Sequence, residues 1–336
     1  MADWRGKFAE LRAQQADELF SLARRAASEG HASLARELIG GTLRENPAHA
    51  EAREALGYQQ SEGQWHTPFT LAKHKAGQVW DDRFGWLPRA RLARYQQDER
   101  YYQGRWISAA QDARLHSQID TGWEVETEHF SIVTNHSLAA AARCGRKLEQ
   151  LHAAWRQACG AYTTSAASVL NAPPPRAYKQ HQVMVFRNRG EYLQALRGEV
   201  PDDVPTTGIY ISRRRTAYFY VPDARPGEPV AFDDTVLFHE GVHQLFHESR
   251  TAVAAPGEKQ NFWLIEGLAC YFESLVEHDG CLSLGGTDAE RFRAAQYRLL
   301  HDAFYVPLEE FSALGRPALQ RDPRIARLYS QAAGLT

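Results

Sequence analysis

The chain has 336 residues, with 39 lysines and arginines against 41 aspartates and glutamates, and a formal net charge of -2 at pH 7. This near balance disfavours a dedicated nucleic-acid or membrane-surface binder. The sequence contains no run of about 18 apolar residues, so it predicts no transmembrane helix. Aromatic residues make up 11% of the chain, which is too many for a disordered protein. The length is sufficient for two or three folding units.

The four cysteines show no Cys-x-x-Cys spacing, which argues against a zinc knuckle or a disulfide framework. Residues 1–5 lack the basic and apolar regions of a secretory signal. We therefore expect a cytoplasmic protein, or an exported one if a signal has been removed from the chain.

Residues 3–60 predict helices, because leucines and alanines recur there at helical spacing. Gly30 separates the first two helices, and Asn46-Pro47 ends the second, since the residue before a proline is pushed out of the helical region. A third helix is expected over residues 48–58. This order resembles a tetratricopeptide unit and a half. One such repeat cannot bury its own face, so we expect it to pack on the next domain. A peptide-binding array is the less favoured alternative, because such arrays need about three repeats, and a protein partner at these helices is an open possibility.

Residues 61–122 predict a connector. Gly63-Gln64-Trp65 and Gly104-Arg105-Trp106 are two copies of a short Gly-x-Trp motif, whose tryptophans are expected to anchor turns in apolar pockets. The strongly charged stretch between them, residues 89–105, is expected to form a solvated helix.

From Trp123 onward, apolar strands and helices alternate and then give way to helices, which is the order of an α+β protein. The triple arginine 213–215 is expected to be a solvated hairpin end and not a nucleic-acid patch. The expected strands are residues 128–134, 182–186, 209–212 and 217–221, and the expected helices are residues 138–161 and 191–197.

The pentapeptide His239-Glu240-Gly241-Val242-His243 fits the pattern His-Glu-x-x-His. Residues at i and i+4 lie on one helix face, so two imidazoles there can bind one metal ion. The glutamate at i+1 points about 100° around the helix, where it can reach a water beside the metal. Asp233 or Asp234 is the expected cap of this helix. Two core histidines without a metal are the plainer alternative.

Glu266 is the candidate third ligand, because it lies in an otherwise apolar helix where a carboxylate is costly unless it is paired or metal-bound. Glu273, two turns further along the same face, can accept the free N–H of a ligand histidine. Cys270 also lies on this face, and we interpret it as a small buried thiol in preference to a thiolate ligand. His247 is interpreted as a helix-end residue.

The second block, Trp263-Leu264-x-Glu266-Gly267-Leu268-Ala269-x-Tyr271-x-Glu273, together with the first resembles the gluzincin metallopeptidases, the superfamily of thermolysin and aminopeptidase N. The arrangement is also similar to a bacterial peptidase MA-like family. The resemblance covers residues 123–336. It implies a zincin-type catalytic domain, with a small mixed sheet, an active-site helix and a helical half. It implies one Zn²⁺ held by His239, His243 and Glu266, with Glu240 as the general base.

Two departures from the family pattern matter. The Gly-x-Met-Glu-Asn block that reads a free amino terminus is absent, and the nearest edge-strand candidate, Gly208-Ile209-Tyr210-Ile211, has no glutamate, which disfavours an aminopeptidase. The resemblance also implies further helix beyond residue 336. For the group that stabilises the oxyanion we favour Tyr329, and its rivals are Tyr297, His301 and Tyr305.

The expected organisation is a helical tetratricopeptide-like region at 1–60, a connector at 61–122 and a gluzincin-like domain at 123–336. The expected function is hydrolysis of peptide bonds by a zinc-activated water, as an endopeptidase rather than an aminopeptidase. The alternatives are a catalytically silent zinc-bearing scaffold and a zinc hydrolase of small amides or cell-wall peptides. Another divalent ion could also occupy the site in vitro.

Overall fold

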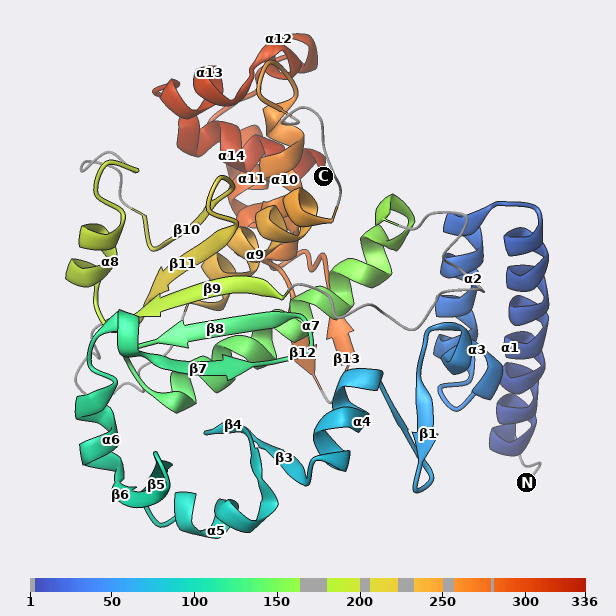
Figure 1. The fold of residues 1–336 in the computed structure, drawn as a ribbon. Helices are drawn as coiled ribbons and strands as arrows, with labels where there is room; N and C mark the ends of the chain where they lie inside the picture. Colours follow the sequence, from blue (N-terminus) through green and yellow to red (C-terminus); the bar gives the residue numbers. More distant parts are fainter. Residues whose placement is uncertain (1–3, 164–179, 200–205, 223–232, 250–256, 279–280) are drawn as a thin grey trace. The chain divides into compact units, whose positions relative to one another are not determined.

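The computed structural model describes residues 4–163, 180–199, 206–222, 233–249, 257–278 and 281–336. The chain is a mixed α+β protein with helices at its N-terminal end (Figure 1). It separates into two compact units. Among the described residues, the first unit comprises 4–80, 86–92 and 155–163, and the second comprises 81–85, 93–154 and those from 180 onward. The division at residues 60 and 122 stays a prediction.

The N-terminal helices are α1 (Trp4–Ser28), α2 (Ala32–Glu45) and α3 (Ala50–Ala55). Small and aromatic side chains form their shared core, in which Ala23, Ala35 and Ile39 are fully buried. The second helix ends one residue before Asn46-Pro47, as predicted. The third helix is shorter than expected because Gly57, at φ +87°, turns the chain into a hairpin.

Three short hairpins follow, each with a glycine in its turn or at the start of its second strand. The prediction of a helix across residues 89–105 is wrong. Gln103 and Gly104 have φ angles of 44° and 84°, which a two-residue hairpin turn requires, and the flanking aromatic residues favour strands. The elements are β1 (Gln59–Ser61), β2 (Gln64–His66), α4 (Pro68–Lys75), β3 (Gln78–Asp81), β4 (Gly85–Pro88), α5 (Leu92–Tyr95), β5 (Glu99–Tyr102), β6 (Arg105–Ser108) and α6 (Ala109–Leu115).

A five-stranded mixed sheet is the centre of the second unit, with the strand order β10-β11-β9-β8-β7. The three inner strands run parallel to one another, and both edge strands are antiparallel to their neighbours. The predicted strands are thereby confirmed, each to within a few residues. Their bounds are β7 (Trp123–Glu126), β8 (Phe130–Thr134), β9 (His181–Phe186), β10 (Gly208–Ile211) and β11 (Thr216–Tyr220).

Different helices cover the two faces of this sheet. On one face, α8 (Arg189–Ala195) packs against Phe186 and Tyr218. On the opposite face lie α7 (Leu138–Thr163), which reaches Ile132 through Gly145, and α9 (Asp234–Glu248), which meets Gly208 through Val236. The alternation of side chains along each strand separates these two sets. The face covered by α9 is the one that carries the candidate site.

The C-terminal part of the second unit is helical (Figure 1). Its core contains Phe262, Phe311 and Leu328, all at most 1% exposed. No helix in the described part of the chain is both long enough and apolar enough to span a bilayer. The elements are α10 (Phe262–Phe272), β12 (Val276–His278), β13 (Cys281–Ser283), α11 (Glu290–Leu300), α12 (Leu308–Ala313), α13 (Arg316–Arg321) and α14 (Ile325–Leu335).

Candidate metal centre

The helix α9 carries the two histidines of the pentapeptide on one face. Asp233 caps it, because its carboxylate accepts a hydrogen bond from the backbone N–H of Thr235 at 3.0 Å. Asp234, in the first turn, is held by Arg143 of α7 at 2.8 Å. These contacts determine the residue at which α9 begins. They thereby determine which side chains of the helix face the protein interior.

A glycine inside the motif lets α9 lie close to α7. A Cβ atom at Gly241 would approach Leu151 Cδ2 to 2.5 Å and Leu148 Cδ2 to 3.1 Å, both shorter than van der Waals contact. Both leucines are at most 1% exposed. The position therefore tolerates no side chain without displacing packed core residues.

A second glycine lets α14 lie close to α10. A Cβ atom at Gly267 would approach the backbone oxygen of Ala332 to 2.8 Å. The preceding residue, Glu266, is only 3% exposed and points toward α9. Glu266 thus directs its carboxylate toward α9, while Gly267 allows α14 to pack against another side of α10.

Three ligand-type atoms converge between α9 and α10. The Nε2 atoms of His239 and His243 are 3.1 Å apart, and Glu266 Oε2 lies 3.3 Å from the first and 3.6 Å from the second. Tetrahedral ligands at about 2.0–2.1 Å from a zinc ion would lie about 3.3 Å from one another. The two imidazole rings, with centroids 4.8 Å apart and planes at 79°, meet edge to face, so both nitrogens can face one ion. The residues fit a divalent metal with nitrogen and oxygen ligands.

The carboxylate oxygen at this point has no other partner. Glu266 Oε2 is buried, and none of the described residues makes a hydrogen bond to it. A buried carboxylate oxygen without a hydrogen-bond donor is costly, because desolvation is not compensated. A cation bound at this oxygen removes that cost.

Glu273 and Arg291 orient the ring of His239 from the side opposite its Nε2 atom. Glu273 Oε1 lies 2.8 Å from His239 Nδ1, which assigns the ring proton to Nδ1 and leaves the lone pair of Nε2 free for a metal. Arg291 of α11 makes two hydrogen bonds to Glu273, at 2.7 and 3.2 Å. Glu273 was expected to accept the free N–H of a ligand histidine, and it lies at His239 Nδ1. Arg291 was not expected, because no sequence pattern connects it to the motif.

The charges of the site support one another. Burial opposes ionisation of Glu266, but the positive charge that His243 and His239 can carry lowers its pKa well below the ordinary value. Burial also disfavours a charged His239, but its neighbours Cys270, Glu266 and Glu273 raise its pKa well above the ordinary value. In this arrangement a positive charge among the carboxylates is strongly favoured, and a divalent ion can supply it.

Glu240 lies beside the edge strand β10. Its Oε2 accepts a hydrogen bond from the backbone N–H of Tyr210 at 2.8 Å. The N–H of Tyr210 therefore points away from β11, toward the outer side of β10, which no other described strand pairs with. Glu240 and this edge strand are neighbours, which the sequence alone did not show.

Of the four candidates for oxyanion stabilisation, the structure brings Tyr329 to the site. Its ring is 6.5 Å from the ring of His239 and nearly parallel to it. Burial, followed by the charge and hydrogen bond of Glu266, raises the pKa of Tyr329, which keeps its hydroxyl protonated and able to donate. The rivals Tyr297, His301 and Tyr305 are exposed.

Two other residues near the motif have different surroundings. His247 lies in the last turn of α9, where its Nδ1 is 2.9 Å from the hydroxyl of Tyr210. Cys270 lies close to His239 and Glu273. Burial raises the pKa of its thiol, and a protonated thiol is a poor metal ligand. Both observations agree with the expectation that neither residue is a ligand.

His129, Glu149 and His152 form a second group of ligand-type atoms. Here the two imidazoles are stacked, with centroids 3.6 Å apart and planes at 24°, and His129 Nδ1 is already bound to Glu149 at 2.7 Å. Stacked rings direct their lone pairs side by side and not toward a common point. This geometry differs from that of His239 and His243 and does not fit a shared ion.

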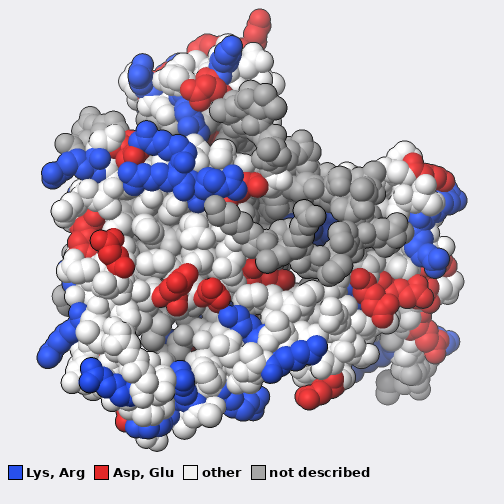
Figure 2. Space-filling view, viewed as in Figure 1, with Lys and Arg blue, Asp and Glu red and all other residues white. Residues whose placement is uncertain are grey.

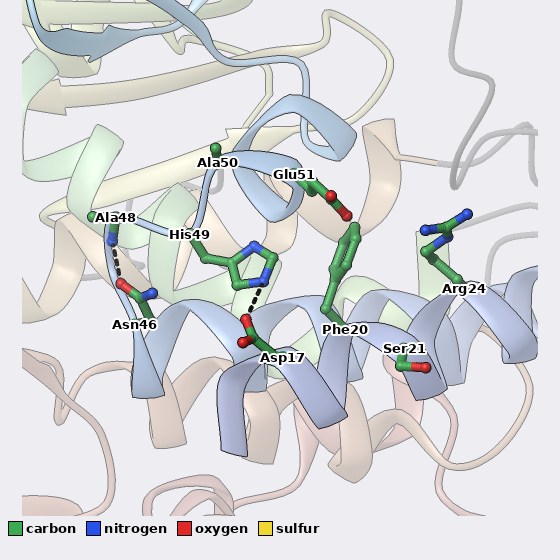
Figure 3. Close-up of a pocket in the computed structure, with 9 residues that line it drawn as sticks. All are labelled: Asp17, Phe20, Ser21, Arg24, Asn46, Ala48, His49, Ala50 and Glu51. Atoms are coloured by element: carbon green, nitrogen blue, oxygen red, sulfur yellow. Dashed lines mark hydrogen bonds and ion pairs between the residues drawn. The ribbon is translucent and has the colours of Figure 1, made fainter. Parts of the chain in front are cut away.

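An open hollow of about 610 Å³ lies between α1 and the start of α3, within the first unit (Figure 3). Two pairs of its polar groups interact, with Asp17 3.3 Å from His49 and Asn46 accepting from the backbone of Ala48 at 3.1 Å. It has a single histidine in its lining and no convergent ligand set. It is a concave surface of the first unit.

No protein-family model matches the chain, and no curated protein matches it.

Proposed function

We propose that this chain is a zinc-dependent peptidase of the gluzincin type, with His239, His243 and Glu266 as metal ligands and Glu240 as the general base. One observation carries the proposal. Two imidazole nitrogens and a buried carboxylate oxygen without a hydrogen-bond donor converge at the spacing of ligands around one ion, directly beside a glutamate. Three protein ligands leave a fourth position open, which is typical of catalytic and not of structural zinc sites.

The chain's own residues supply the remaining chemistry. Zinc, when bound, acts as a Lewis acid that lowers the pKa of water and polarises a carbonyl group. Glu240 takes the proton of the attacking water and returns it to the leaving amine. The hydroxyl of Tyr329 donates a hydrogen bond to the developing oxyanion. An extended peptide would pair with the outer edge of β10, where no further strand lies among the described residues, and would compete with Glu240 for the N–H of Tyr210.

We infer an endopeptidase and not an aminopeptidase. The four residues of β10, from Gly208 to Ile211, include no carboxylate that would bind a free α-amino group. This strand therefore offers no group to bind a free amino terminus, and we expect peptides to be cut at internal bonds.

The experiment compares the wild-type chain with Glu240→Gln on an unfolded protein such as casein. Mass spectrometry is expected to find internal cuts with the wild type, and a rate at least about 100-fold lower with the variant, because the proton acceptor is lost. Both proteins are expected to hold one zinc per chain by elemental analysis, whereas Glu266→Ala is expected to lose it. Unchanged cleavage by Glu240→Gln would show that another residue is the base.

Two alternatives predict different results in the same experiment. A silent zinc-bearing scaffold would bind zinc and cleave nothing, and its partner would bind the N-terminal helices, where the hollow of Figure 3 offers a concave surface. A hydrolase of small amides or cell-wall peptides would cleave those compounds and leave casein intact. Glu240 favours the catalytic alternatives, because a scaffold does not need a base beside its metal.

A further inference from the structure

The turn between β10 and β11 consists largely of arginine side chains that reach solvent. Arg213, Arg214 and Arg215 have side chains that are 66%, 41% and 49% exposed. Figure 2, in the same view as Figure 1, shows Lys and Arg gathered across the region of this hairpin. The turn directly follows the strand whose edge lies beside Glu240.

The turn carries more positive charge than its described neighbours neutralise. Arg213 and Arg214 both pair with Glu199, and Arg215 pairs with Glu248. The two carboxylates are largely buried, with side chains 12% and 4% exposed, and Glu248 also accepts from His181, Gln244 and the hydroxyl of Tyr210. Of the described groups at the turn, three guanidinium groups therefore face two carboxylates, and the guanidinium groups are the ones that reach solvent.

We propose that this turn selects peptide substrates with acidic residues on the N-terminal side of the cleaved bond. The proposal rests on the peptidase function proposed above. Tyr210 marks the reacting position, because its backbone N–H holds Glu240. A peptide pairing with β10 passes the arginine turn roughly two to four residues away from that position, since strands pair residue by residue.

The direction of the peptide follows from pairing strength. Antiparallel pairs are more stable per residue than parallel ones, so we place the peptide antiparallel to β10. In that orientation, residues N-terminal to the cleaved bond lie next to Ile211 and the turn. Aspartate or glutamate there would meet exposed guanidinium groups, which bind carboxylates in a two-pronged geometry.

The test maps the cuts made in a mixture of peptides, using the zinc-loaded wild-type chain, Arg213→Glu and Arg213→Lys. Arg213 is the best position to change, because Arg214 still pairs with Glu199 after the change. Asp and Glu are expected to be enriched two to four residues N-terminal to the cut with the wild type. Arg213→Glu is expected to lower kcat/KM for an acidic peptide roughly 3- to 10-fold with a neutral peptide unchanged, and Arg213→Lys to keep most of the preference.

The control is Arg114→Glu, the same charge reversal on α6, which contacts the opposite edge strand β7 through Asp112 and Trp123. It is expected to leave the preference as it is. High salt is expected to weaken the preference in the wild type, since exposed charges are screened. Cuts that depend on Glu240 but show no acidic enrichment, or an enrichment unchanged in Arg213→Glu, would overturn this inference alone. The absence of any Glu240-dependent cut would overturn the peptidase function together with it.

Discussion

The carboxylate of Glu266 lies 3% exposed in a helix whose other residues are all apolar, aromatic or glycine. Such a group is stable only if charges or a metal replace its hydration. His239 and His243 approach it from α9, and Glu273 with Arg291 orients the first of them. Glu266 could be identified as a candidate from the sequence, because burying a charged side chain in an apolar helix costs free energy in any fold.

Arg291 is expected to act on the metal through Glu273. Arg291→Ala should weaken zinc binding about 10- to 100-fold, because Glu273 then holds the ring of His239 less firmly. Competition with a chelating dye measures this affinity. Arg291→Lys should restore part of it, and Arg293→Ala, at an exposed position on the same helix, is the matched control. Equal zinc affinity for Arg291→Ala and the control would rule out the positioning role.

Glu248 is expected to make stability depend on pH. Burial would raise its pKa, but His181, Gln244 and Arg215 together lower it below the unfolded value of about 4.3. A carboxyl group with a lowered folded pKa stabilises the fold above the unfolded pKa, and this contribution disappears as pH falls through the folded pKa.

Glu248→Gln should therefore lower the free energy of unfolding by about 1–3 kcal/mol at pH 7, because His181 and Arg215 lose a charged partner. The difference between wild type and variant should shrink as pH falls below the unfolded pKa of about 4.3. Urea unfolding at several pH values measures it. A difference that stays constant with pH would mean that the charge of Glu248 contributes nothing.

At the scale of elements, glycines decide how closely the helices of the site approach. Gly241 lets α9 lie against α7, and Gly267 lets α14 lie against α10. The second approach matters for chemistry, because α14 carries Tyr329. Neither glycine has an unusual backbone angle, so only the packing of distant helices explains them.

Gly241→Ala is expected to lower the free energy of unfolding by about 1–3 kcal/mol, because the new methyl group overlaps Leu151 in a packed core. Chemical denaturation measures the loss. The double variant Gly241→Ala with Leu151→Ala should lose less than the sum of the two single changes, since the methyl group then occupies vacated space. Strict additivity would show that the two residues do not compete for the same volume.

The hairpins between the N-terminal helices and the sheet were not predicted from the sequence. The stretch from Arg89 to Arg105 is charged enough for a solvated helix, but a turn at residues 96–98, with Asp98 at φ 59°, ends a short helix and a hairpin follows it. Gly85-Trp86 begins β4, which is the second strand of its hairpin, as β2 and β6 are in theirs. The Gly-x-Trp pattern did not identify it, because its glycine and tryptophan are adjacent. Turn geometry and not composition determined these elements.

At the scale of the whole molecule, zinc is expected to stabilise the unit that contains its ligands. At a free zinc concentration of 100–1,000 times Kd, binding contributes about 3–4 kcal/mol to that unit. Chelation should therefore reduce hydrogen-exchange protection in α9 and α10 and leave α1 and α2 unchanged, since the ligands all lie in the second unit.

The chelator should have no such effect on His243→Ala, which has lost one ligand. Loss of protection in α1 and α2 to the same degree as in α9 and α10 would contradict a contribution confined to the second unit. An identical change in hydrogen-exchange protection in the wild type and in His243→Ala would also contradict it.

The sequence by itself determined the α+β order and most of the helices and strands, together with the placement of His239 and His243 on one face of a helix. These properties depend on periodicity and spacing along a few neighbouring residues, which local geometry imposes in any fold. Only the tertiary structure decided that Glu266 meets both histidines, that Tyr329 and not Tyr297 or Tyr305 lies at the site, and that Arg291 holds Glu273. Those contacts join helices far apart in sequence, and packing at close-approach glycines sets their distances.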